Sequence, residues 1–240
     1  MINLIRVELF KLVTTRRTTI IFLLVSAGLC LLFTLVPLLA TDEITTEQDV
    51  LDLLASGQIA ALVLLILGAV NMGGEARHGT QVATFLATPV RWRVVVAKSL
   101  AHAIAGLVAG VLNLVMGLVA VLLFADAPWP DGGDLLLQVL GGLGVTALLA
   151  SFGVAMGAIL RNQAAAVSGT LIFLLVIEPL LSVFVEFVDK YGITASELTM
   201  ATPGGDNGVA QGVGALVMVG WTLAVTLIAL GVIERRDVRG

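Results

Sequence analysis

The most polar stretch in the interior of the chain, residues 73–98 (GGEARHGTQVATFLATPVRWRVVVAK), lies between two long apolar runs. It holds Glu75 and His78 near its start and Arg91 and Arg93 near its end. A metal site needs several ligating side chains together, and His78 has no cysteine and no carboxylate beyond Glu75 close to it in the sequence. We therefore expect no metal site here and interpret these residues by where a fold would place them.

Two kinds of catalysis would leave recognisable residues, and the sequence contains neither set. ATP hydrolysis needs a G-x-x-x-x-G-K-[ST] loop, and the glycine pairs at Gly141 and Gly204 lack the lysine and the strand-to-helix context. An intramembrane hydrolase would need paired groups at membrane depth, such as two glutamates with a histidine or a Ser–Lys dyad. We expect no catalytic residue and no enzyme activity in this chain.

Glu178 is an acid inside an apolar run, and Pro179 follows it directly. An ionisable residue within a membrane segment is by default a candidate functional residue. Counted from Ala164, Glu178 lies roughly 21 Å along a helix, in the outer part of a hydrocarbon core. We predict that Glu178 and Pro179 break this helix, and that a short outer segment then dips back into the membrane.

Composition places the chain in a membrane, since 58% of its 240 residues are hydrophobic, only 12% are charged and the mean hydropathy is +1.06. The apolar runs show no period-2 alternation, which favours helices over barrel strands. The first run is longer than a signal-peptide core and has no clear cleavage site. We predict an all-α, polytopic integral membrane protein, a single transmembrane domain over residues 1–240 with six spans at about 18–41, 53–74, 97–125, 135–160, 164–187 and 209–233.

The distribution of lysine and arginine predicts the orientation of the chain. If the N-terminus is cytoplasmic, all of the 13 Lys and Arg residues except Lys190 fall on the cytoplasmic side, and the opposite loops are acidic. We therefore expect both termini in the cytoplasm and a location in the plasma (inner) membrane. Lys98, at the start of the third span, is expected to snorkel to the surface. His102 and Asn113 are expected to form hydrogen bonds between helices.

Residues 1–17 (MINLIRVELFKLVTTRR) have an amphipathic pattern, with Arg6 and Lys11 set among apolar residues. We predict an N-terminal helix lying in the membrane interface, in contact with lipid; the alternative is a plain cytoplasmic extension of the first span. Its predicted apolar stripe consists of Ile2, Ile5, Leu9 and either Leu12 or Val13.

Residues 75–96 are predicted to hold a short cytoplasmic helix with rigid ends. Gly79 and Thr80 provide a break and an N-cap, and Pro89 ends the helix. An apolar helix face exposed to the cytoplasm predicts a groove on a partner; the alternative is that Phe85 packs on the chain's own helix ends. Glu75 would either cap the second span or position this segment through Arg77, Arg91 or Arg93. The apolar face consists of Val82, Phe85 and Leu86.

This stretch resembles the E-x-x-x-G-T…L-x-T-P-x-x-R…K pattern between the second and third spans of ABC-2 type transporter permeases, and VELFKLVTTRRT is similar to the E-x-x-K…R-x-T opening of that family. The six-span layout agrees with the resemblance, which covers the whole chain in topology and these two stretches in residues. The matching residues are Glu75, Gly79, Thr80, Leu86, Thr88, Pro89, Arg93 and Lys98.

The resemblance implies the permease subunit of an ATP-binding cassette exporter, with residues 79–89 as the coupling helix docked on a separate ATPase. It further implies that ATP and Mg bind that partner, that this chain binds no cofactor, and that a second permease chain, identical or related, completes the pathway. We expect an amphiphilic substrate (drug, antibiotic, peptide or lipid) and no nucleic-acid partner. The alternatives are a proton-coupled carrier that uses Glu178, and a permease-like membrane anchor in a self-resistance or assembly complex.

Two G-x-x-x-G spacings, at Gly106 and Gly110 and at Gly153 and Gly157, are typical of close helix packing. Because five neighbouring spans compete for each face, we predict that both pack within the chain rather than at a dimer seam.

Overall fold

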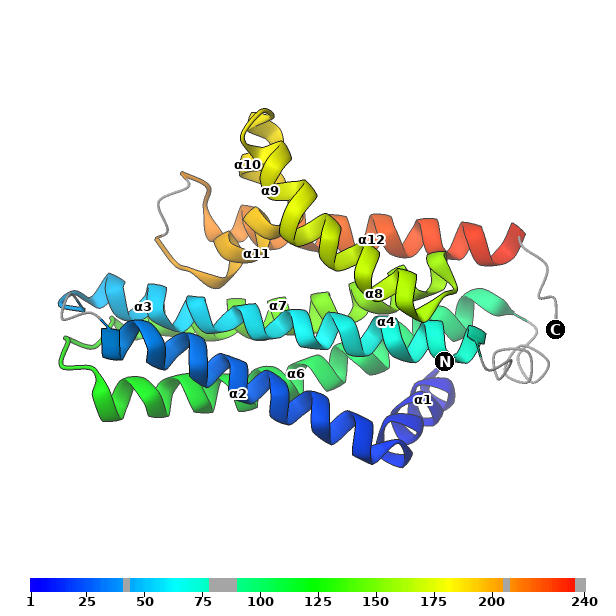
Figure 1. Ribbon diagram of the computed structural model, residues 1–240, viewed down its shortest axis with the longest axis horizontal. Coiled ribbons are helices and arrows are strands. Elements are labelled where there is room, and N and C mark those ends of the chain that lie inside the picture. The colour runs from blue at the N-terminus through cyan, green and yellow to red at the C-terminus, as the bar shows by residue number, and fades with distance from the viewer. Residues whose placement is uncertain (41–43, 78–89, 205–207, 236–240) are drawn as a thin grey trace.

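The computed structural model describes residues 1–40, 44–77, 90–204 and 208–235, and every regular element among them is a helix (Figure 1). The elements are α1 (Ile2–Thr14), α2 (Arg16–Ala40), α3 (Glu47–Ser56), the 3-10 turn η1 (Gly57–Ala60), α4 (Ala61–Arg77), α6 (Arg91–Phe124), α7 (Gly132–Leu160), α8 (Gln163–Ile172), the π-helical turn η2 (Phe173–Ile177), α9 (Glu178–Ser182), α10 (Glu186–Tyr191), α11 (Ile193–Ala201) and α12 (Gln211–Arg235).

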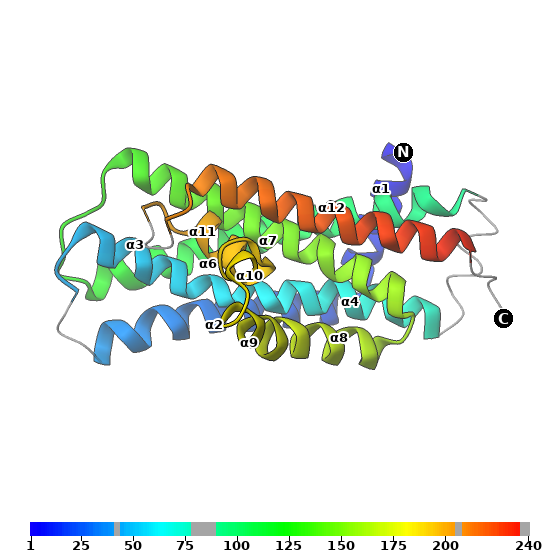
Figure 2. The ribbon, with the colours of Figure 1, turned by 90° about the horizontal axis from the view of Figure 1, so that it is seen from above.

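Six helical segments of the described chain are long and apolar enough to cross a membrane, and the prediction of an all-α chain is confirmed over the described residues. All but the fifth of these segments run along a common direction and form an elongated bundle, and the fifth slants away from it through α8 and α9 (Figures 1 and 2). The six segments cover Arg16–Ala40, Glu47–Glu75, Arg91–Phe124, Gly132–Leu160, Gln163–Ser182 and Gln211–Arg235.

The second segment begins at Glu47, six residues before the predicted span, because its acidic residues form a helix cap. The Thr46 hydroxyl accepts a hydrogen bond from the Asp49 amide, and the Asp49 carboxylate accepts one from the Thr46 amide. Acidic residues in the first turn also suit the positive end of the helix dipole. A charge that bounds an apolar run can therefore still belong to the helix.

The centre of the bundle is built on α4 and α7, whose backbones approach closely where glycine removes the side chain. A Cβ on Gly153 of α7 would overlap the backbone of Leu65 in α4, and one on Gly106 of α6 would overlap the backbone around Thr146 in α7. Both G-x-x-x-G pairs thus face other helices of the same chain, which confirms the prediction of intramolecular packing.

The two ends of the bundle differ in charge. α1, the last turn of α12, the α7–α8 connection with Arg161 and the starts of α2 and α6 lie at one end (Figure 1). The end of α2, the start of α3 and the α6–α7 connection lie at the other, with Asp126 and Asp131 in that connection. The basic and acidic residues that the sequence predicted to lie on opposite sides of a membrane are therefore found at opposite ends of the helices.

The fifth segment is irregular before Pro179 rather than at it. Its backbone forms a π turn over Phe173–Ile177, continues as a helix through Pro179, and ends at Ser182, not at residue 187. Proline has no amide hydrogen to donate, so the preceding turn adjusts. The Ser182 hydroxyl donates to the Pro179 carbonyl at 2.9 Å. The chain then folds back through α10 and α11, which packs against α12 and α7.

Substituting Gly153→Ala should destabilise the bundle by about 1–3 kcal/mol, because the added methyl group overlaps backbone that cannot move aside easily. The measurement is thermal unfolding of the purified chain in detergent, followed by circular dichroism. Gly220→Ala in α12 is the matched control, since open space surrounds its added Cβ. Equal melting temperatures for the two variants would contradict the close α4–α7 approach.

Candidate functional site

The site lies where α1, α4 and α6 meet. α1 turns away from α2 at Thr15, so α1 and α2 form a V at one end of the bundle (Figure 1). α1 packs against α6. Only Glu8 and Leu12 of α1 are buried, and they face the bundle. A buried acid on a short helix requires a counter-charge, and the neighbouring helices supply it.

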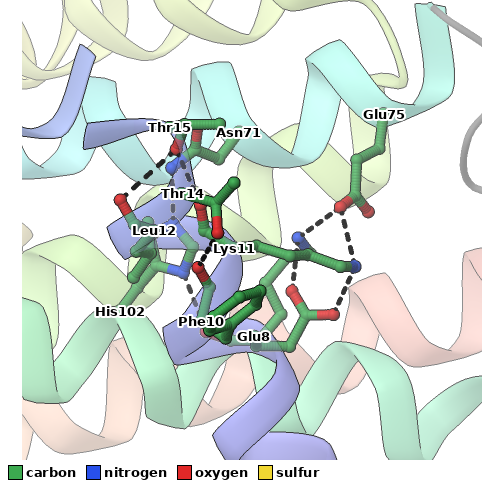
Figure 3. Close-up of a pocket in the computed structure, with 10 residues that line it drawn as sticks. Glu8, Phe10, Lys11, Leu12, Thr14, Thr15, Asn71, Glu75 and His102 are labelled. Carbon is green, nitrogen blue, oxygen red and sulfur yellow. Dashed lines mark hydrogen bonds and ion pairs between the residues drawn. The ribbon is translucent and has the colours of Figure 1, made fainter. Parts of the chain in front are cut away.

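Lys98 of α6 is the centre of the arrangement and is only 2% exposed. Its Nζ lies 2.7 Å from Oε2 of Glu8 on α1 and 2.9 Å from Oε1 of Glu75 on α4 (Figure 3). One ammonium group thus joins three helices. The expectation that Lys98 snorkels to the surface is wrong, because two carboxylates meet it inside the bundle.

Lys11 of α1 completes the network at its more exposed side. Its Nζ lies 2.6 Å from Oε1 of Glu8 and 3.1 Å from Oε1 of Glu75. Burial is the largest single influence on the pKa of Lys11 and lowers it, but the hydrogen bonds and charges of Glu8 and Glu75 together outweigh burial and raise that pKa. The contribution of Lys11 to stability is therefore full at neutral pH and is lost as the pH rises through its raised pKa.

The two lysines and two glutamates, named here the α1 clamp (Glu8, Lys11, Glu75 and Lys98), balance in charge. Because ions lose hydration on burial, such a cluster adds little net stability compared with apolar residues of the same shape. Its value is positional, since removal of one member leaves the charges of the other three unbalanced inside the protein. The α1 clamp therefore fixes α1 against the ends of α4 and α6 in one arrangement.

A polar pair continues the clamp one turn further along α6. His102 Nδ1 lies 2.9 Å from the Lys98 carbonyl, which can only accept, so Nδ1 carries the hydrogen. His102 Nε2 then accepts from Asn71 Nδ2 of α4 at 3.0 Å. Asn113 donates to Ser26 of α2 at 3.0 Å. The prediction that His102 and Asn113 bond between helices is confirmed.

A cavity of about 440 Å³ adjoins the clamp. Phe10 and Thr14 of α1, Thr15 at its C-terminal cap, Asn71 of α4 and His102 of α6 are among the residues that line it (Figure 3). The described part of the chain holds no group of three or more His, Cys, Asp or Glu side chains that could bind a metal ion. With its lysines and glutamates paired to each other, the arrangement is suited to holding helices in register.

Most of the predicted coupling residues, namely Gly79, Thr80, Val82, Phe85, Leu86 and Pro89, lie outside the described residues. Arg91 begins α6 and donates from Nη1 to the Ile233 carbonyl of α12 at 3.2 Å. The Arg93 guanidinium lies 5.6 Å from the ring centroid of Trp92. Glu75 is brought to Lys11 and Lys98, and its predicted role through an arginine stays a prediction.

Glu178 lies apart from the clamp and has a structural partner. It is 4% exposed, and its Oε1 accepts a hydrogen bond of 2.7 Å from the Thr194 amide in the first turn of α11. A carboxylate at a helix N-terminus satisfies amides that the helix leaves open. Burial, and next the charge of Glu178, raise the pKa of nearby Glu197 on α11 to about 8.

Sequence reasoning did not assign Glu8, Lys11 or Asn71 to the site. A signal for Glu8 was present, because it lies between Ile5 and Leu12 on the apolar stripe of residues 1–17, where a charge predicts a buried partner. The E-x-x-K spacing of Glu8 and Lys11 was a second signal. No comparable signal marks Asn71, whose partner lies on another helix.

No protein-family model and no curated protein matches this chain. The function is therefore inferred from the residues and their geometry.

Substituting Lys98→Met should lower the free energy of unfolding by about 3–5 kcal/mol, because the buried Glu8 and the partly buried Glu75 are left with Lys11 as one cation for two carboxylates. Chemical unfolding in mixed micelles measures it. Lys190→Met removes the exposed pair with Glu186 and should change little, which makes it the matched control. Adding Glu8→Gln to Lys98→Met should recover part of the loss. A Lys98→Met variant as stable as the parent chain would refute the clamp.

Proposed function

We propose that the chain is the membrane-spanning permease subunit of an ABC-2 type exporter, driven by a separate ATP-binding cassette ATPase. The six apolar helical segments and the residue pattern at 75–98 support this proposal. In this proposal both termini are cytoplasmic, which agrees with the collection of basic residues at the end of the bundle that holds α1 and the last turn of α12 (Figure 1).

The observation that carries the proposal is the ion pair between Glu75 and Lys98. These residues stand on the two helices that flank the proposed coupling segment, 23 positions apart, and their side chains meet at 2.9 Å. The pair closes the base of the α4–α6 connection. A displacement of that connection would therefore move α4 and α6 together instead of spreading them.

The clamp gives this movement a route into the rest of the chain. Glu8 ties α1 to Lys98, and Arg91 ties the start of α6 to the last turn of α12. An ATPase that closes on ATP and pushes the connection would shift the adjoining ends of α1, α4, α6 and α12 as one body. Coupling of this kind needs packed elements with few alternative arrangements, and a buried ion cluster provides them.

The proposal includes a second permease chain, identical or related, and an amphiphilic cargo (drug, antibiotic, peptide or lipid). Large apolar side chains are exposed along the fifth segment and α12, the last two membrane segments, which is typical of faces that meet lipid or another chain. Examples are Leu175, Val176, Leu223 and Leu227.

Substituting Phe85→Asp should abolish capture of the ATPase, because a charge on the apolar face of the coupling helix opposes burial in a groove. The tagged chain is purified from its native membrane, and vanadate-sensitive ATPase activity in the eluate is measured. Thr84→Asp makes the same change on the opposite helical face and should retain the activity. Equal activity with Phe85→Asp and with the parent chain would disprove the coupling assignment.

Substituting Glu178→Gln separates the exporter from a proton-coupled carrier. Glutamine keeps an oxygen that can accept the Thr194 hydrogen bond but cannot exchange a proton. The exporter proposal expects vanadate-sensitive ATPase activity of the purified complex to stay within about twofold of the parent. Substrate export that is abolished by Glu178→Gln and driven by a pH gradient without ATP would favour the carrier.

A further inference from the structure

A groove of about 430 Å³ runs between α1, α2 and α6, on the side of α1 away from the clamp. Leu9 and Val13 of α1 form one wall, Ile20 and Leu23 of α2 form the other, and Val108 of α6 lies on the floor. The walls are apolar along their length. Figure 1 shows α1 and α2, whose residues form the two walls, meeting in a V.

A single cation lines this groove. Arg16, the first residue of α2, is exposed, and among the described residues its guanidinium has no hydrogen-bonding or ionic partner. Thr19, one turn further, donates its hydroxyl to the Leu12 carbonyl at 2.8 Å and so joins α1 to α2. The groove thus combines one positive end with an apolar channel.

The geometry points to a binding site for an anionic phospholipid, with its phosphate on Arg16 and an acyl chain along the groove. A guanidinium binds phosphate oxygens through two parallel hydrogen bonds and attracts the extra charge of an anionic headgroup. A protein helix, about 10 Å across, is too wide for a channel of this volume, whereas a single flexible chain fits it. The site is independent of the exporter proposal.

Occupancy of the groove has a mechanical effect on α1. Leu12 lines both the groove and the cavity beside the clamp, so α1 has ion pairs on one side and the lipid chain on the other. A bound lipid therefore holds α1 against α6 and favours the closed clamp. Removal of the lipid leaves Leu9 and Val13 without a neighbour on that side.

The full chain is reconstituted in nanodiscs of phosphatidylcholine with increasing phosphatidylglycerol, extracted into detergent, and its retained lipids are counted by native mass spectrometry. Arg16→Gln should lower retained phosphatidylglycerol about fivefold, the effect of one interfacial cation. Arg17→Gln, an exposed neighbour outside the groove, is the matched control and should retain the parent level. Equal losses of phosphatidylglycerol from Arg16→Gln and Arg17→Gln would show that general surface charge attracts the lipid. That result would contradict the proposed site.

A second pair of variants tests the channel without changing charge. Val108→Trp fills the groove and should reduce retained phosphatidylglycerol, whereas Val119→Trp, three turns along the same exposed face of α6, should not. Circular dichroism melting of each variant confirms that it is folded. Equal retention in Val108→Trp and Val119→Trp would show that no acyl chain occupies the groove.

Discussion

The burial of Lys98 is the constraint on which the arrangement of this end of the molecule depends. An ammonium group that is 2% exposed must be met by negative charge, and neither carboxylate comes from its own helix. Glu8 and Glu75 therefore have to arrive from α1 and α4 together. Three helices that share no continuous backbone at this point are held in one geometry by a single amine.

The same constraint explains why α1 is not simply an amphipathic helix resting on lipid. Its exposed residues include Val7, Phe10 and Val13, as an interfacial helix requires, yet its buried face contains an acid. α1 is consequently bound to protein through charge and to its surroundings through apolar contact. Beside it, His102 is hydrogen-bonded through both ring nitrogens, to Asn71 and to the Lys98 carbonyl.

Much of the architecture follows from local sequence. Long apolar runs predict the six segments because length and composition suffice for a membrane helix, and paired glycines at Gly153 and Gly157 predict close packing. The start of the second segment was placed too late, because the acids before residue 53 belong to α3, where Asp49 completes the cap. The clamp was beyond sequence reasoning because Lys11 and Glu75 are 64 positions apart and only the fold brings them together. The outer part of the fifth segment shows the same limit, since the partner of Glu178 lies on α11.

Because Glu75 pairs with Lys98, the stability of the bundle depends little on the residues between them in the α4–α6 connection. Once the base of a loop is fastened, its length has little influence on stability, and each doubling adds only about 0.6 kcal/mol to the entropy of closure. Insertions or replacements between the two fastened positions would leave the bundle nearly undisturbed. The sequence of this connection could therefore change during evolution to bind a different protein, while the helical bundle stays the same.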